Sequence, residues 1–381
     1  MFKFIFFYKY KYHMKIYQYL LLITVFLVSL SAIIIFSKNK DKINAARNIL
    51  KLTDQEIDEW LICAEKVTNR TDAINDLNDF NNKIPIQGMV NDKQVIQKYY
   101  HVLNDFCAMG STGVWMALPN IMDETKNEDE NMLLYQKWLS KQFNVNENGK
   151  VLEIACGIGR QAYNMSKFTN ATIYGFNINE KHIKMAKQYA LENNNDKVIY
   201  NVGDLNDKFN YDNEMFDAVY VTEALPYSND LYSVFKEVFR VLKPGGRFVL
   251  SEVVLLDKFD KSNNRHMELA RLGRMSWGGG GLWHYKYWED AGKEAGFDLR
   301  MSTGGAVDNE IVPEFLYILK EYDYYKSIEK YVNILAKMGI ISKNMLKIQQ
   351  RFNVGGEAIK EIGEKQLLTL SWNFVFEKPK A

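Results

Sequence analysis

An apolar run that ends in a glycine turn constrains the fold of this chain more than any other feature. Residues 151–160 read VLEIACGIGR, and a helix-like segment, 160–168, follows. Gly157 and Gly159 carry no Cβ atom, so the backbone can bend sharply there and lie close to a ligand. A helix that starts directly after such a turn points its first N–H groups, and the positive end of its dipole, at an anionic ligand group. The pattern predicts a strand–turn–helix unit that binds a nucleotide-type cofactor.

The segment from 149 to about 300 alternates strand-like and helix-like patterns. We expect strands at 150–154, 171–176, 198–202, 216–221 and 247–255, and helices at 160–168, 180–192 and 231–242. This alternation predicts βαβ units and an α/β, doubly wound parallel sheet with helices on both faces. The apolar residues 367–376 predict a last, antiparallel strand at the sheet edge. The segment 311–350 reads as helices, which we expect to form a lid or a membrane-facing patch.

The N-terminal region has no charged residue between Lys15 and Lys38, a stretch of 22 residues. As a helix it would span roughly 33 Å, which matches a hydrocarbon core of about 30 Å. A cleaved signal peptide read from Met14 is the alternative, but the apolar run continues past its small-residue site at 29–32. The sequence therefore predicts one transmembrane anchor at 16–37. Lysines flank both of its ends, so the positive-inside rule does not decide its orientation.

Composition narrows the classes of partner. The chain carries 48 Lys and Arg against 47 Asp and Glu, a net charge of +1, which argues against nucleic acid as the main partner. Its three cysteines, Cys63, Cys107 and Cys156, form neither a disulfide framework nor a paired metal site, so we expect no metal and a reduced, cytosol-facing domain. The aromatic content of 14% fits either a tyrosine-rich core or a pocket for a bulky apolar substrate.

The residues after the glycine turn distinguish between cofactors. Residues 157–162 formally fit the dinucleotide fingerprint G-x-G-x-x-A. The acidic residue expected about 20 positions later is absent, but the side chain of Asn177 or Asn179 can form a hydrogen bond with a ribose hydroxyl instead. Asp204, after the third strand, can accept a hydrogen bond from an adenine amino group. Glu153, at the end of the first strand, can reach the cationic end of a sulfonium donor.

Together with LKPGG at 242–246, these residues resemble the class I methyltransferases, which use S-adenosyl-L-methionine (SAM). The segments 151–160, 172–179, 219–224, 235–246 and 250–260 are similar to the sterol methyltransferase family over roughly residues 95–300. The resemblance implies a Rossmann-like sheet. It also implies a set of SAM-binding residues: Glu153, Ala155, Gly157, Gly159, Asn177, Asn179, Asp204 and Leu205.

The resemblance to the sterol methyltransferase family does not indicate which sterol carbon is methylated. Members that alkylate sterol C-24 carry an aromatic, acidic segment upstream of the donor motif, because aromatic faces and a carboxylate stabilise a carbocation. Much of that content is missing from residues 99–115. We therefore slightly favour the nematode-type reaction at C-4 of a 3-keto sterol, which needs a base and a donor to the oxygen. The candidates for proton handling are His101, Asp105, Glu223 and His266.

Two other functions remain open from the sequence. The first is transfer to another lipid or to an amine, such as phosphoethanolamine or a quinol. The second is a catalytically inactive SAM-binding scaffold. The expected organisation is a basic and aromatic tail (1–15), the anchor (16–37), a helical linker (38–94), a methyltransferase domain (95–310), and C-terminal helices with the final strand (311–381). We expect a single-pass protein of the endoplasmic reticulum membrane whose catalytic domain faces the cytosol. The sequence does not indicate an oligomeric state.

Overall fold

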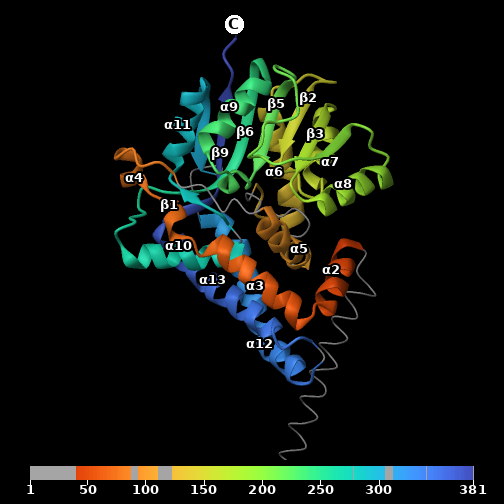
Figure 1. The fold of residues 1–381 in the computed structure, drawn as a ribbon, viewed down its shortest axis with the longest axis vertical. Helices are drawn as coiled ribbons and strands as arrows, with labels where there is room; N and C mark the ends of the chain where they lie inside the picture. Colours follow the sequence, from red (N-terminus) through yellow and green to blue (C-terminus); the bar gives the residue numbers. More distant parts are fainter. Residues whose placement is uncertain are drawn as a thin grey trace, which may run out of the picture.

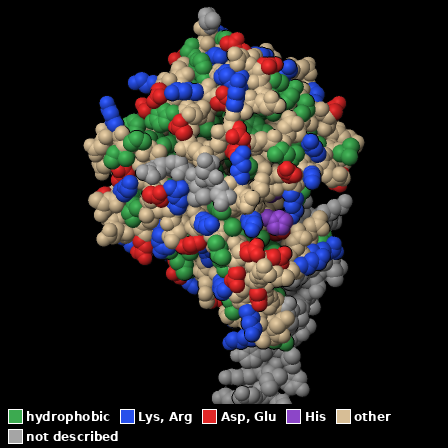
Figure 2. Space-filling view, viewed as in Figure 1, with side chains coloured by type: hydrophobic (Ala, Val, Ile, Leu, Met, Phe, Trp, Pro, Cys, Tyr) green, Lys and Arg blue, Asp and Glu red, His purple; other side chains and the backbone are tan. Residues whose placement is uncertain are grey.

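The computed structural model describes residues 40–86, 93–109, 122–277, 279–304, 312–339 and 341–380. The predicted N-terminal tail (1–15) and anchor (16–37) lie outside these residues. Among the described helices, none is both long and apolar enough to cross a membrane. On the face shown in Figure 2, basic and acidic side chains are interspersed rather than gathered into patches of one sign.

A seven-stranded sheet of order β4-β3-β2-β5-β6-β9-β8 forms the centre of the molecule (Figure 1). Its strands are β2 (Lys150–Ile154), β3 (Thr172–Asn177), β4 (Val198–Val202), β5 (Phe216–Thr222), β6 (Leu242–Leu255), β8 (Asp298–Gly304) and β9 (Leu368–Glu377). Neighbouring strands from β4 to β6 pair in parallel, and β9 is antiparallel to both β6 and β8. The expected parallel sheet with an antiparallel last strand is confirmed. The expected edge position is wrong, because β8 pairs along the outer side of β9.

Helices cover both faces of the sheet and also extend beyond one end of its strands (Figure 1). The helices are α2 (Lys40–Lys51), α3 (Asp54–Thr68), α4 (Leu77–Asn81), α5 (Lys93–Met109), α6 (Glu128–Gln142), α7 (Arg160–Thr169), α8 (Glu180–Glu192), α9 (Leu231–Val241), α10 (Asn264–Trp277), α11 (Tyr285–Ala295), α12 (Val312–Lys337) and α13 (Met345–Lys365). Two short strands, β1 (Ile74–Asn75) and β7 (Leu282–Trp283), pair in parallel apart from the main sheet. Two 3₁₀ turns, η1 (Thr71–Ala73) and η3 (Leu225–Tyr227), complete the described elements.

Each face of the sheet has its own buried core. On one face, α6, α7 and α8 bury apolar side chains such as Leu139, Met165 and Ile183. On the other, α9 and α11 pack Phe235 and Trp288 against the opposite side of the strands. These two cores follow from the alternation of side chains along a strand, which gives both faces of a parallel sheet an apolar surface to bury.

The join between α9 and β6 differs in detail from the expectation. We expected Pro244 and the two following glycines to separate the helix from a strand that starts at 247. In the structure α9 ends at Val241 and β6 already begins at Leu242. Gly246 lies so close to the neighbouring strand that a Cβ atom there would stand 2.9 Å from the carbonyl oxygen of Asp217. The glycine is therefore needed inside the strand for a close approach of two backbones.

A layer of helices lies beyond the carboxyl ends of the parallel strands: α3, α5, α10, α12 and α13 (Figure 1). The indole nitrogen of Trp60 on α3 donates to the carbonyl oxygen of Tyr99 on α5 at 2.9 Å. The buried guanidinium of Arg351 on α13 donates to the carbonyl oxygen of Ala64 and to the hydroxyl of Thr68, both on α3. These bonds hold α3, α5 and α13 together over the sheet edge where parallel α/β proteins bind ligands.

Candidate active site

The turn between β2 and α7 adopts the sharp backbone bend that its sequence predicts. Ala155, Gly157 and Gly159 have φ values of +57°, +52° and +77°. The turn is held by three hydrogen bonds: Cys156 N to the Phe176 carbonyl oxygen, Gly159 N to the Cys156 carbonyl oxygen, and the Tyr200 hydroxyl to the Gly159 carbonyl oxygen, each at 2.9 Å. A left-handed backbone favours glycine, as at Gly157 and Gly159. The three hydrogen bonds hold the turn in a single conformation.

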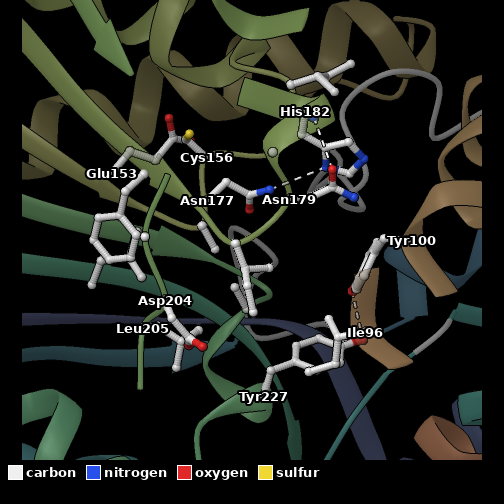
Figure 3. A pocket seen from close by; sticks show the side chains of 18 of the residues that line it. Ile96, Tyr100, Glu153, Cys156, Asn177, Asn179, His182, Asp204, Leu205 and Tyr227 are labelled. Carbon is white, nitrogen blue, oxygen red and sulfur yellow. Dashed lines mark hydrogen bonds between the residues drawn. The ribbon is translucent and has the colours of Figure 1, made fainter. Parts of the chain in front are cut away.

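A cavity opens directly above this turn, at the carboxyl ends of β2, β3 and β5 (Figure 3). All eight residues expected to bind SAM are near it, and seven of them line it: Glu153, Ala155, Gly157, Asn177, Asn179, Asp204 and Leu205. Gly159 lies within the same turn, where its lack of a side chain serves packing against Tyr200 and Ala186.

Glu153 is the buried carboxyl group of the cavity. Its side-chain Oε2 has no hydrogen-bond partner among the described residues. Burial raises the pKa of Glu153 to about 8. A cation that enters beside this carboxyl group would stabilise its ionised form, because burial has removed the water that otherwise solvates the charge.

The wall after β3 presents amides in place of a carboxylate. Asn179 caps α8, its Oδ1 accepting from the backbone nitrogens of Lys181 at 2.9 Å and His182 at 3.3 Å. The side-chain nitrogen of Asn177 lies 3.4 Å from Nδ1 of His182. Burial lowers the pKa of His182 to about 4, so its ring is neutral near pH 7. This wall is therefore uncharged and offers amide and imidazole groups to a ribose.

Asp204 provides the carboxylate on the opposite wall. Its Oδ1 accepts from the backbone nitrogen of Asn206 at 2.9 Å and from the Asn206 side chain at 3.1 Å. Its Oδ2 lies 3.0 Å from Nζ of Lys93, the first residue of α5. The side chain is almost fully buried, and both it and Leu205 line the cavity.

Two tyrosines close the side of the cavity that faces the helical layer. The Tyr100 hydroxyl on α5 donates to the Tyr227 hydroxyl on η3 at 2.7 Å, and the rings meet edge to face. Burial raises the pKa of Tyr227 well above its usual range, so it remains a phenol at neutral pH. Gln97, one turn earlier on α5, donates to the carbonyl oxygen of Ile178 at 3.0 Å. Sequence reasoning singled out none of these three side chains.

Of the four residues expected to handle protons, the structure brings Glu223 to the cavity. Glu223 follows β5 with a φ of +52°, and its backbone nitrogen donates to the Ser251 carbonyl oxygen at 2.9 Å. Behind it, Oε1 of the buried Glu252 accepts from the backbone nitrogens of Ala224 and Leu225, at 3.2 and 3.0 Å. Glu252 therefore fixes the short turn that presents both Glu223 and Tyr227.

The other three candidates lie away from the lining of this cavity. His101 faces a second hollow on the far side of α5, where its Nδ1 is 3.3 Å from Nζ of Lys181. Asp105 accepts from the Asn48 side chain at 3.1 Å and so joins α5 to α2. His266 accepts from the backbone nitrogen of Asp260 at 3.1 Å. Their surroundings indicate structural contacts, and among the four we carry only Glu223 forward as a group that can reach a substrate.

The cavity fits SAM on three observations of the described residues. The orphaned oxygen of Glu153 suits a cation. A Cβ atom added at Gly157 would meet no heavy atom within 4 Å, so the backbone there is open to a ligand. Asp204 offers a buried carboxylate to a hydrogen-bond donor. The described residues contain no group of three or more His, Cys, Asp or Glu side chains arranged to hold a metal ion.

Comparison with known proteins agrees with this site. A family model described as a methyltransferase domain matches residues 145–295. The sterol 24-C-methyltransferase of Aspergillus fumigatus is 30% identical over 265 residues, which cover 64% of this chain and 70% of that protein. The enzyme of the same name from Clavispora lusitaniae is 27% identical over 303 residues, or 74% of this chain and 80% of that protein.

Among solved structures, the (4+2)-cyclase SpnF shares the fold with a TM-score of 0.58 at 14% sequence identity, over 78% of this chain and 100% of that one. At this identity the likeness concerns the fold alone. The fold and site define a class I methyltransferase that uses SAM as its methyl donor. Within that class, the chain belongs to the sterol methyltransferase family.

Proposed function

We propose that this protein transfers the methyl group of SAM to a carbon atom of a sterol. The observation that carries the proposal is one cavity in which the SAM-binding residues on β2, β3 and β5 and the side chains of Tyr100 and Ile96 on α5 lie together. The two relatives named above are sterol methyltransferases. Bound SAM supplies an electrophilic methyl group and leaves as S-adenosylhomocysteine (SAH). The apolar and aromatic wall of α5 faces the space where an acceptor must lie.

The N-terminal segment supports a lipid substrate. The uncharged stretch 16–37, which lies outside the described residues, has the length and composition of a membrane anchor. Sterols partition into bilayers, so an anchored enzyme would meet its substrate in two dimensions. We propose a location on the endoplasmic reticulum membrane, with the methyltransferase domain on the cytosolic side, where the donor is made.

For the position of the new methyl group, we retain C-4 of a 3-keto sterol as the proposal. Two groups of the cavity support it. Glu223 is a carboxylate that can take the proton from C-4. The Tyr227 hydroxyl, which accepts from Tyr100, is a phenol that can donate to the 3-oxygen as it gains charge. Methylation of C-24 is the second candidate, and the names of the relatives favour it.

The test uses the full-length protein in detergent or lipid nanodiscs with methyl-labelled SAM. The acceptors are a panel of 3-hydroxy and 3-keto sterols, a quinol and phosphoethanolamine, and NMR locates the new methyl group. Label at C-4 supports the proposal, and label on the side chain replaces it with C-24 chemistry. Label only in the quinol or the amine overturns the sterol assignment. SAH binding without turnover of any acceptor would instead indicate an inactive scaffold.

A pair of variants tests the base directly. Glu223→Gln keeps the shape of the side chain but removes its basicity, so we expect kcat to fall by about 10²–10⁴-fold while SAH still binds. His266→Gln is the matched control, because His266 lies away from the cavity lining, and its kcat should stay close to that of the wild type. Equal activities of the two variants would remove Glu223 from the mechanism.

A further inference from the structure

Helix α5 spans the mouth of the SAM cavity and is bonded to both of its walls. Gln97 donates to the Ile178 carbonyl oxygen on the β3 side, and Tyr100 bonds to Tyr227 on the β5 side. Figure 3 shows Ile96 and Tyr100 facing the cavity from this helix, with Glu153 and Asp204 across from them. The helix therefore forms one wall for the cofactor and for the space beside it.

The third attachment of α5 is an ion pair between Lys93 and Asp204, the carboxylate expected to bind the adenine amino group. Nζ of Lys93 lies 3.0 Å from Oδ2 of Asp204 and 3.1 Å from Oδ2 of Asp207. The Asp204 side chain is 6% exposed, whereas that of Lys93 is 53% exposed. Hydrogen bonds to Asp204 and then Asp207 raise the pKa of Lys93, which keeps its ammonium group charged.

The two oxygens of Asp204 have separate partners. Oδ1 is occupied by two nitrogens of Asn206, so the orientation of the carboxylate is fixed from below. Oδ2 forms the ion pair with Lys93. Because a carboxylate oxygen has two acceptor positions, Oδ2 can also accept a hydrogen bond from an amino group. A buried carboxylate that loses its counter-ion is strongly disfavoured. Asn206 thus orients the carboxylate through Oδ1, and docked α5 supplies the counter-ion that stabilises the charge on Oδ2 at the cavity.

We propose that Lys93 is a positioning residue for the cofactor: it holds Asp204 in place for the adenine amino group and thereby couples SAM binding to the docking of α5. The coupling is reciprocal, because the binding of SAM and the docking of α5 are two linked equilibria of one protein. Since α5 also carries Tyr100, cofactor binding would complete the wall against which the acceptor lies. The proposal rests on the assignment of Asp204 to adenine.

The test compares Lys93→Met with Lys98→Met in the full-length protein. Lys98 is the matched control, since it is an exposed lysine on the same helix, 3.7 Å from Glu59 and away from the cavity lining. Calorimetry measures the Kd of SAH at low and high salt, and hydrogen exchange measures the protection of residues 93–109. Lys93→Arg tests rescue, and Asp204→Ala tests the underlying assignment.

We expect Lys93→Met to weaken SAH binding by about 5- to 50-fold, within the usual range of coupling between sites. Salt should weaken wild-type binding, because Lys93 is exposed, and should have less effect on the variant. SAH should protect α5 in the wild type and in Lys93→Arg, but not in Lys93→Met, while protection of the 155–159 turn persists in all three.

Three outcomes would overturn the proposal. If Lys93→Met binds SAH as tightly as Lys98→Met, Lys93 does not position the site. If Lys93→Met binds weakly but keeps both the salt dependence and the α5 protection, its role is merely structural. If Asp204→Ala binds SAH normally, the adenine assignment itself fails, and the coupling fails with it while the SAM chemistry at Glu153 stands.

Discussion

Replacing the turn glycines with alanine, one at a time, should separate the stability of the fold from the binding of the cofactor. Both residues have a left-handed backbone, with φ of +77° at Gly159 and +52° at Gly157. A Cβ atom at Gly159 would stand 2.6 Å from the Tyr200 hydroxyl oxygen and 2.7 Å from the Ala186 Cβ. A Cβ atom at Gly157 would meet no heavy atom within 4 Å, and that residue lines the cavity.

The expected magnitudes follow from these surroundings. A left-handed backbone costs a non-glycine residue about 1–2 kcal/mol. Forcing a methyl group into packed surroundings typically adds about 1–3 kcal/mol. Neither neighbour of Gly159 moves easily, because the Tyr200 ring is buried and Ala186 Cβ is attached directly to α8. We therefore expect Gly159→Ala to lower the free energy of unfolding by about 2–5 kcal/mol, and Gly157→Ala by only about 1–2 kcal/mol.

Binding should show the reverse order. The new methyl group at 157 occupies space that a cofactor needs, and an overlap of about 1–3 kcal/mol corresponds to a loss of SAH affinity of about 5- to 150-fold. Gly339→Ala is the control, because Gly339 has φ of +71°, no heavy atom within 4 Å of an added Cβ, and a position after α12 away from the cavity. Urea unfolding and calorimetry with SAH measure the two quantities. If Gly157→Ala binds SAH like Gly339→Ala, or if Gly159→Ala is no less stable than Gly157→Ala, the proposed geometry of the turn is wrong.

Two further predictions concern ionisation and hydrogen bonding in the cavity. The native state holds a proton on Glu153 that the unfolded chain has released, since burial raises this pKa from 4.5 to about 8, so the stability of the cofactor-free protein should fall as pH rises through that window. Glu153→Gln should flatten this part of a plot of Tm against pH. It should also abolish the proton release that calorimetry in two buffers detects when SAM binds near pH 7. An unchanged plot of Tm against pH would contradict the raised pKa of Glu153. Tyr227→Phe removes the hydroxyl bonded to Tyr100 and should lower kcat on a 3-keto sterol by about 10²-fold or more. Tyr135→Phe loses a comparable bond to Asn373 away from the cavity lining and should leave kcat unchanged, so similar kcat losses in the two variants would contradict a role for Tyr227 in the reaction.

The sequence predicts the centre of the sheet because each central strand is an apolar run with a clear end. Strands β2 and β4 have the expected bounds, and β3 and β5 differ by one residue at one or both ends. It does not predict β8, which lies at the sheet edge, is exposed or half-buried over most of its length, and contains no apolar run. The sequence consequently predicts the last apolar run at the sheet edge, whereas β8 pairs along its outer side.

The same contrast holds for the site. The cofactor residues follow strand ends, and strand ends meet at one edge of a parallel sheet, so chain order suffices to collect them. Substrate-facing residues on α5 depend on helix phase. The chemistry of its imidazole makes His101 a candidate for proton handling, but it lies about 100° around the helix from Tyr100 and lines the second hollow. The sequence indicates which residues share a helix, and only tertiary packing fixes which face is turned to the cavity.

The proposed function assigns donor and acceptor to different parts of this protein. The donor side is built by the sheet, whose β2–α7 turn is fixed by backbone bonds and by Gly159, where an added Cβ would meet Tyr200 and Ala186. In the proposed function, the acceptor side is built by α5 and η3, which reach the cavity through the tyrosine pair, the Gln97 bond and the Lys93 ion pair. A change in α5 can then alter which acceptor is methylated while leaving SAM affinity nearly intact, provided that it spares the contacts that dock the helix, which are the Lys93 ion pair, the Gln97 bond and the Tyr100–Tyr227 bond. Substitutions at Ile96 should thus change acceptor preference, whereas substitutions in the 155–159 turn should reduce the rates with all acceptors together.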